Sequence, residues 1–266
     1  MVGFCKKVLI ADTVAPLADA AFAIKNPSMM DAWLGTIAYT IQLFFDFSGY
    51  TDMAIGLALM IGFVFPQNFN DPYTSKSITE FWQRWHMSLS SWLREYLYIP
   101  LGGNKKGTRR TYINLFLTML LGGLWHGANW TFVVWGAWHG GILAIERYLK
   151  SKFGDSILPS WLRIIKTMLL VMIGWIFFRA IDLNNALQML RGLIGLNGFN
   201  FSNMMEWQIE PDRLGILFVA IFLVYAMPWL HRYRGGPMRY LLIPLFFWAV
   251  ATLSAQNFTP FLYFQF

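Results

Sequence analysis

Charged side chains are scarce in this sequence, and the scarcity narrows its class. Of 266 residues, 13% are Asp, Glu, Lys or Arg, whereas 56% are hydrophobic. Soluble domains carry roughly 25% charged residues, so the composition excludes an ordinary soluble domain and predicts an integral protein of the lipid bilayer. The formal net charge of +7 is scattered between apolar runs. This pattern fits loops beside anionic lipid and argues against a nucleic-acid partner.

Several catalytic and metal motifs are also missing. The single cysteine, Cys5, excludes an internal disulfide and a cysteine-based metal cluster. Neither an HExxH zinc motif nor a GxSxG nucleophile motif occurs. We therefore expect no metal site and no bound cofactor. A catalytic histidine in this chain would work as a general base without a triad.

Long apolar runs are what the sequence has instead. They cover residues 32–47, 53–65, 112–125, 130–145, 164–178, 214–230 and 240–253. Several are shorter than the roughly 20 residues of a lone membrane span. The sequence therefore predicts an all-α, polytopic membrane protein whose helices are tilted or broken and packed in a bundle. If spans alternate, the basic loops 76–110, 147–166 and 232–239 share one side, which the positive-inside rule makes cytoplasmic.

His126 lies in the apolar run GGLWHGANW at residues 122–130. A titratable ring at membrane depth is costly, so it needs a partner, a hydrated cavity or a function. The neighbouring glycines allow backbone to approach closely, and the tryptophans can wall off a pocket. We predict that His126 is the catalytic centre, supported by Trp125 and Asn129. The structural alternative is a helix-end histidine bonded to a backbone carbonyl.

Two further histidines accompany it. A second Trp-His-Gly at His139 falls inside a longer predicted helix, where a supporting or packing role is expected. His86 follows Trp85 in the segment 81–96, whose spacing predicts one amphipathic helix at the membrane interface, capped by Ser77 or Thr79. Its predicted apolar face holds Trp82, Trp85, Leu89, Trp92, Leu93 and Tyr96. His86 is at the border of that face, where it either points into a cavity or serves the anchor as a polar neighbour.

Two carboxylates separate the first pair of apolar runs. Asp46 and Asp52 flank the polar stretch 47–51, so we expect the helix to break there. Buried carboxylates need a partner or water, and Arg179 is the candidate partner. A buried ion pair that closes the bundle is one interpretation, and an ion or proton relay is the other.

Four motifs, in order, carry a family resemblance: FFDFSGYTDMAIGLALMIGF, FPQNFNDPY, SITEFWQRWHMSLSSWLREYLYIPLGGNKKG and GLWHGANWTFVVWGAWHG. The chain resembles the bacterial membrane-bound O-acyltransferase (MBOAT) family, nearest to its members that acetylate alginate, cellulose or other exopolysaccharides. Members usually have a sizeable membrane region before the segment that matches residues 3–12. The resemblance therefore implies that residues 1–266 are the C-terminal portion of a single MBOAT domain.

The resemblance also implies a reaction and a location. An acetyl group would pass from acetyl-CoA in the cytoplasm to a hydroxyl of an exported polysaccharide or of a periplasmic acetyltransferase partner protein, across the bacterial inner membrane, as in alginate biosynthesis. His126 matches the family's catalytic histidine, and His86 matches its second polar position, where it would orient the acyl carbonyl or the donor. Cationic side chains that would attract the CoA phosphates are Arg84, Arg94, Lys105 and Lys106.

Two other functions stay open from the sequence. One is a transporter that uses Asp46, Asp52 and the histidines as an ion or proton path. The other is a non-catalytic assembly subunit, which the family's additional N-terminal region makes plausible.

Overall fold

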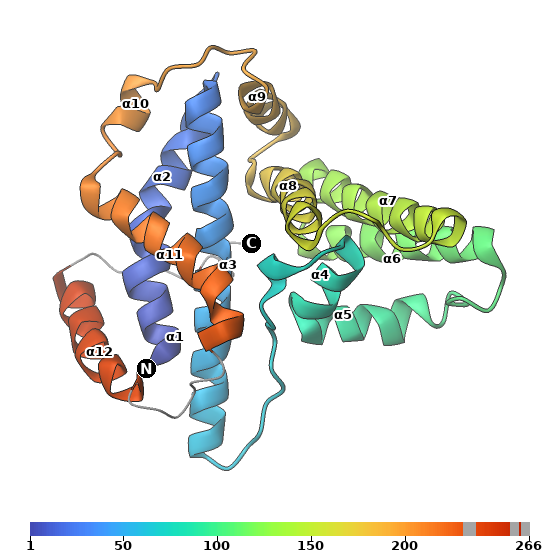
Figure 1. Cartoon of the computed structure of the whole chain (residues 1–266), viewed down its shortest axis with the longest axis horizontal. Coiled ribbons are helices and arrows are strands. Elements are labelled where there is room, and N and C mark those ends of the chain that lie inside the picture. The colour runs from blue at the N-terminus through green and yellow to red at the C-terminus, as the bar shows by residue number, and fades with distance from the viewer. Residues whose placement is uncertain (231–237, 256–260, 262–266) are drawn as a thin grey trace. The chain divides into compact units, whose positions relative to one another are not determined.

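The computed structural model describes residues 1–230, 238–255 and 261, and all regular structure in these residues is helical (Figure 1). The all-α prediction is confirmed for this part of the chain. Two compact units are present. The central unit is Asn68–Leu187, and the terminal unit combines Met1–Gln67 with Gln188–Phe266. Helix α9 (Leu183–Leu193) crosses the boundary between them.

The terminal unit is built on one long helix, α3 (Met29–Met60). It begins at a capping box, in which the Ser28 hydroxyl accepts from the Asp31 N–H and the Asp31 carboxylate accepts from the Ser28 N–H. Figure 1 shows α2 beside α3 and α11 crossing both, in agreement with their contacts. The other elements of this unit are α1 (Val2–Cys5), the π-helical segment η1 (Lys6–Ala11), α2 (Asp12–Ala23), α10 (Asn203–Glu206), α11 (Pro211–Leu230) and α12 (Met238–Ala255).

The predicted break at residues 47–51 is wrong, because α3 runs through this stretch without interruption. Its polar groups are accommodated inside the helix: the Thr51 hydroxyl donates to the Phe47 and Ser48 carbonyls at 3.2 and 3.1 Å. Gly49 allows the backbone of α3 to pack closely against Gly3, since a Cβ at position 49 would come within 2.7 Å of the Gly3 carbonyl oxygen. The glycine therefore marks a helix–helix contact and not a turn.

Lysine side chains near the N-terminus pair with the two carboxylates. Lys7 forms ion pairs with Asp46 at 2.9 Å and with Asp12 at 2.6 Å, all three side chains being at most 8% exposed. Lys6 pairs with Asp52 at 2.7 Å. Both lysines precede α2 in the chain, so a short segment of the terminal unit contributes cations to both carboxylates. Buried charges persist when they are paired in this way.

The central unit contains the predicted histidine sites. Its elements are the 3₁₀ turn η2 (Pro72–Thr74), α4 (Ile78–Arg84), α5 (Met87–Leu93), the π-helical segment η3 (Arg94–Tyr98), α6 (Thr108–His126), α7 (Trp130–Phe153) and α8 (Ser160–Arg179). Helices α6 and α7 form an antiparallel hairpin, seen edge-on in Figure 1. Residues 102–107 form the turn before α6.

Glycines allow the two hairpin helices to touch through their backbones. A Cβ at Gly123 would come within 2.3 Å of the Phe132 carbonyl oxygen, and one at Gly136 within 2.5 Å of the Met119 carbonyl oxygen. A Cβ at Gly140 would meet Phe116 Cα at 2.9 Å. Gly136 and Gly140 make a small-xxx-small pair, which permits this close approach in membrane helices.

The single amphipathic helix predicted over residues 81–96 is also wrong. The chain leaves the helix at Trp85, and His86 adopts the left-handed conformation at φ 44° and ψ 56° before α5 begins. A non-glycine residue in that region costs about 1–2 kcal/mol. Trp85 is consequently buried, whereas Trp92 and Tyr96 are 48% and 63% exposed and do not share its face. The predicted cap is confirmed, because the Ser77 side chain accepts from the Glu80 N–H at 3.0 Å.

Two described helices have the length and apolar composition of a membrane span, Ser160–Arg179 and Pro211–Leu230, and the shorter Tyr240–Ala255 is also apolar. The predicted number of spans therefore stays a prediction. Most of the predicted basic loop 232–239 lies outside the described residues.

Candidate functional site

Helix α4 lies along α7 and ends at the Trp85–His86 turn. At its beginning, the Glu146 carboxylate on α7 accepts from the Ile78 N–H at 3.1 Å, and from the N–H and hydroxyl of Thr79 at 2.9 and 2.8 Å. One turn later, Trp82 contacts His139, with ring centroids 5.2 Å apart. The two helices are therefore antiparallel, and α4 delivers its last residues toward the N-terminal end of α7.

Helix α8 is antiparallel to α7 on another side. The indole N–H of Trp138 donates to the Leu170 carbonyl at 2.8 Å, and the Asn129 side-chain amide donates to the Ile181 carbonyl at 2.9 Å. Asn129 also caps α7, because its side-chain oxygen Oδ1 accepts from the Thr131 N–H at 3.1 Å. The supporting role predicted for Asn129 is therefore structural in this arrangement: it joins the start of α7 to the end of α8.

His126 is the last residue of α6 and lies in a ring of aromatic side chains. Trp125, Trp135 and Phe178 meet its imidazole edge-on, with centroids 5.0, 5.2 and 5.1 Å away, and Phe132 is 6.2 Å away. We call these four side chains the aromatic cage. None of the described residues hydrogen-bonds the imidazole, so the backbone-carbonyl alternative has no support. His126 as a residue is half-buried.

His139 is fully buried one layer away from His126. Its ring contacts Trp135, Trp82 and Trp175, at 5.2, 5.2 and 6.3 Å. Neither ring nitrogen has a hydrogen-bond partner among the described residues. Trp135 lies between the two histidines and touches both. His139 therefore has no access to solvent, and this position suits the packing role that was predicted for it.

His86 occupies the turn between α4 and α5. Its Nδ1 is 3.3 Å from the Asn68 Oδ1 and 3.3 Å from the Ser88 hydroxyl oxygen, while its Nε2 is buried. A chain of ring contacts links this turn to His126: Trp85 contacts Trp175, Trp175 contacts Phe178, and Phe178 contacts His126, with centroids 4.9, 5.9 and 5.1 Å apart. The structure thus brings together two histidines that are separated by 40 positions in the sequence (126 minus 86).

Trp85 anchors the turn beside His86. It is 4% exposed and lies near-parallel to Tyr73 and Phe81, with ring centroids 5.8 and 5.6 Å away. Trp175 of α8 is closer still, at 4.9 Å. The tryptophan is therefore a core residue that fixes the turn.

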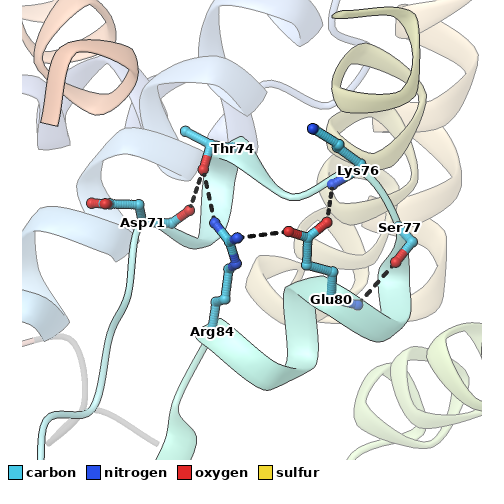
Figure 2. A network of polar contacts seen from close by, with 6 residues as sticks. All are labelled: Asp71, Thr74, Lys76, Ser77, Glu80 and Arg84. Atoms are coloured by element: carbon cyan, nitrogen blue, oxygen red, sulfur yellow. Dashed lines mark hydrogen bonds and ion pairs between the residues drawn. The ribbon is translucent and has the colours of Figure 1, made fainter. Parts of the chain in front are cut away.

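Of the four cationic side chains predicted to attract CoA, Arg84 is engaged in a local network (Figure 2). Its guanidinium pairs with Glu80 at 2.7 Å and donates to the Thr74 hydroxyl at 3.2 Å, while Glu80 also accepts from the Lys76 N–H at 2.7 Å. The other three are exposed: Arg94, Lys105 and Lys106.

Asp46 and Asp52 belong to the terminal unit, where the lysines described above hold them. The residues that sequence reasoning missed are Asn68, Glu146, Gly174 and Phe178. Asn68 lies within the motif FPQNFNDPY, whose sequence alone indicates no role for a single residue. The other three are placed by contacts between helices that have no local signature. Among the described residues, no group of three His, Cys, Asp or Glu side chains could hold a metal ion.

A family model for MBOAT, the membrane-bound O-acyltransferase family, matches residues 1–189 of this chain. This range includes both His86 and His126 and all of the helices that position them. The chain belongs to the MBOAT family. The predicted resemblance is confirmed, and the membrane class inferred from the composition is consistent with it.

Individual MBOAT relatives show how much of a longer protein the chain resembles. It is 47% identical over 305 residues to the "Probable alginate O-acetylase AlgI" of Azotobacter vinelandii, covering 100% of this chain and 61% of that protein. It is 42% identical over 232 residues to the "Peptidoglycan O-acetyltransferase" of Helicobacter pylori, covering 85% and 44%. It is 35% identical over 135 residues to the "Teichoic acid D-alanyltransferase" of Bacillus subtilis, covering 48% and 34%. The chain thus spans about three fifths of the alginate O-acetylase.

Proposed function

We propose that this chain carries the catalytic histidine of a membrane O-acyltransferase that moves an acetyl group from a thioester donor to a hydroxyl of an exported polymer. The observation that carries the proposal is His126, whose imidazole is hydrogen-bonded to no described residue and is walled by the aromatic cage. The relatives named for alginate, peptidoglycan and teichoic acid support polymer hydroxyls as the acceptor class.

His126 acts as the general base in this reaction. Its unprotonated nitrogen takes the proton of the acceptor hydroxyl, and the oxygen attacks the thioester carbonyl. The carbon–sulfur bond then breaks, and the imidazolium returns its proton to the departing thiolate. The cage rings exclude water, which protects the thioester from hydrolysis and strengthens the electrostatic interactions of the imidazole.

The two ends of the hairpin of α6 and α7 have different roles in this proposal. Acyl transfer takes place at one end, and the acyl donor binds at the other end. His126 ends α6, whereas Lys105 and Lys106 precede its first residue. From Thr108 to His126 the helix rises about 27 Å, at roughly 1.5 Å a residue, which is close to the thickness of a bilayer core. The lysines therefore suit attraction of the acetyl-CoA phosphates from the cytoplasm, and they lie too far from His126 to take part in the chemistry.

We infer that the protein crosses a bacterial inner membrane several times and that His126 lies near its outer face, which the separation of His126 from the basic turn before α6 supports. The acceptor is then an exopolysaccharide such as alginate, or a periplasmic acetyltransferase partner that passes the acetyl group on. No observation favours transport, because the carboxylates of the alternative ion path are paired with Lys6 and Lys7. The assembly-subunit alternative is decided by the assay below.

The test measures acetyl transfer and thioester hydrolysis in membranes that contain the full-length protein, with His126→Ala and His126→Gln beside the unmodified protein. Acetyl transfer should fall by at least about a hundredfold in both variants, as expected for loss of a general base, while membrane insertion is unchanged. Asn70→Ala, an exposed position, is the control. Near-normal transfer by the His126 variants would remove this residue from the mechanism. Absence of transfer by the unmodified protein, with its partners bound, would favour the assembly subunit.

A further inference from the structure

Trp135 carries a buried hydrogen-bond donor inside the aromatic cage of His126. Its side chain is 2% exposed, and its indole nitrogen has no hydrogen-bond partner among the described residues. An indole nitrogen donates and does not accept. A buried donor without an acceptor costs about 1–3 kcal/mol, so a substrate oxygen that accepted from it would remove that cost.

The other members of the cage cannot supply an equivalent donor. Phe132 and Phe178 carry no polar hydrogen. Trp125 has an indole N–H, but its side chain is 59% exposed, so water can hydrate it in the absence of substrate. Trp135 is therefore the cage residue that brings a desolvated N–H to the ring of His126.

Unpaired nitrogens also occur in the layer behind the cage, and they help to single out Trp135. Trp82 and Trp175 have buried indole nitrogens without a partner among the described residues, and both rings contact His139. Trp135 belongs to both layers, because its ring contacts His126 and His139 with centroids 5.2 Å away in each case. Of these three unpaired indoles, Trp135 is thus the one in contact with the proposed base.

The Trp135 ring is fixed before any substrate binds. Four rings contact it at centroid distances of 5.2, 5.2, 5.7 and 5.5 Å: His126, His139, Trp82 and Phe178. The backbone is constrained as well, since a Cβ at Gly136 would come within 2.5 Å of the Met119 carbonyl oxygen. A donor that is already in place needs no reorganisation during the reaction, which makes it effective in stabilising developing charge.

The spacing of the Trp135 and His126 rings suits a tetrahedral carbon between them. Their planes are 88° apart, and their centroids are separated by 5.2 Å. In acyl transfer, the attacking oxygen is hydrogen-bonded to the imidazole, while the carbonyl oxygen on the same carbon needs a donor. Two hydrogen bonds of about 2.8 Å, joined through one carbon atom, can bridge the edges of two rings at this separation.

We propose that the Trp135 indole N–H donates a hydrogen bond to the thioester carbonyl oxygen and stabilises the negative charge that this oxygen gains during acyl transfer at His126. The inference rests on the proposed acyl transfer and adds a catalytic residue to it. The acceptor hydroxyl oxygen bonds to the carbonyl carbon, its proton passes to His126, and the π electrons of the carbonyl move to its oxygen. When the carbon–sulfur bond breaks, the carbonyl re-forms and the thiolate takes the proton from the imidazolium. The indole keeps its own proton throughout.

The functional test compares Trp135→Phe with Trp138→Phe in membranes that contain the full-length protein. Trp138 is the matched control on the same helix, because its indole N–H is already bonded to the Leu170 carbonyl at 2.8 Å. Trp135→Phe should lower kcat by at least about tenfold, and by up to about a thousandfold, with the KM for the acyl donor unchanged. Trp138→Phe should lower the unfolding midpoint and leave kcat unchanged. Normal kcat in Trp135→Phe, or equal loss of kcat in both variants, would overturn the proposal.

A second variant covers the case in which Trp135→Phe does not fold. Benzothienylalanine at position 135 keeps the shape of the tryptophan side chain and has sulfur in place of the indole N–H. It should preserve the unfolding midpoint and show the same loss of kcat. Full activity with this sulfur analogue would show that Trp135 only walls the site, which contradicts the proposal.

A spectroscopic measurement separates this proposal from the acyltransferase assignment. In full-length protein labelled with ¹⁵N at the indoles, the Trp135 N–H signal is identified by its loss in Trp135→Phe. We expect its proton signal to move downfield when the oxygen-ester analogue of acetyl-CoA binds, and this shift needs no turnover. An unmoved signal with the analogue bound would overturn the proposal even if His126→Gln abolishes transfer. Normal transfer by His126→Gln would reject the proposed function, whereas the shift of the Trp135 signal would still report the contact with the carbonyl.

Discussion

The backbone of Gly174 lies directly against the imidazole of His139, so that a Cβ at position 174 would come within 2.5 Å of Nε2. The ring cannot move away, because Trp82 and Trp135 contact it from other sides and its exposed surface is zero. The packing of the histidine in α7 therefore requires a residue without a side chain at this position of α8. Together they set the distance between two helices that contribute to the aromatic cage.

Gly174→Ala should destabilise the protein by about 1–3 kcal/mol, the usual cost of overpacking a filled core. The measurement is the thermal unfolding midpoint in detergent, together with acetyl transfer. Gly215→Ala in α11 is the matched control, since a Cβ there meets nothing within 4 Å. The double variant Gly174→Ala with His139→Ala should recover part of the loss in a double-mutant cycle. Additive losses would mean that the two residues do not interact.

The Glu146 carboxylate provides the cap that begins α4, through three hydrogen bonds from Ile78 and Thr79. Glu146→Ala should cost about 1–2 kcal/mol, in the range measured for lost helix caps and unsatisfied backbone donors. Because α4 ends at His86, the variant should also lower kcat. Ser77→Ala removes only the local cap at Glu80 and serves as the comparison. Equal kcat in the two variants would show that Glu146 does not position the turn.

The predictions that held depend on local patterns. The second Trp-His-Gly run predicted that His139 lies inside a longer helix, and it does. The helix-starting residue Ser77 has a partner three residues away, so its role as a cap could be predicted from the sequence. The positions of helices and their buried faces could be inferred because both depend on residues a few positions apart in the sequence.

The predictions that failed depend on long-range partners. The break at His86 is produced by Asn68, which lies 18 residues earlier, and helical periodicity continues across it. Similarly, the polar stretch 47–51 resembles a turn until Lys6 and Lys7 are known to neutralise its flanking carboxylates. Neither set of partners could be identified from residue spacing. In both segments, bonds to residues distant in the sequence outweigh the conformation that the local sequence favours.

The hairpin of α6 and α7 depends on glycine at Gly136, where the nearest atoms to an added Cβ are backbone atoms of Met119 and Leu120 at 2.5 and 2.9 Å. Backbone cannot give way as a side chain can, so Gly136→Ala should separate the helices and lose at least about 1–3 kcal/mol. Gly141→Ala, on the same helix with nothing within 4 Å, should be neutral or slightly stabilising because alanine favours the helix. The check is the unfolding midpoint of each variant. Equal midpoints would contradict the close backbone contact.

Lys105 and Lys106 provide a test of how the acyl donor is recruited. Both side chains are exposed in the turn before α6, so Lys105→Gln with Lys106→Gln should leave stability unchanged. If they attract donor phosphates electrostatically, the KM for acetyl-CoA should rise by about threefold to tenfold at low ionic strength, and the difference should shrink as salt screens the charges. The kcat should not change, because His126 lies at the opposite end of α6. The control is Lys25→Gln, an exposed lysine of the terminal unit. A fall in kcat with an unchanged KM would place the lysines in the reaction itself, contrary to the geometry of the hairpin.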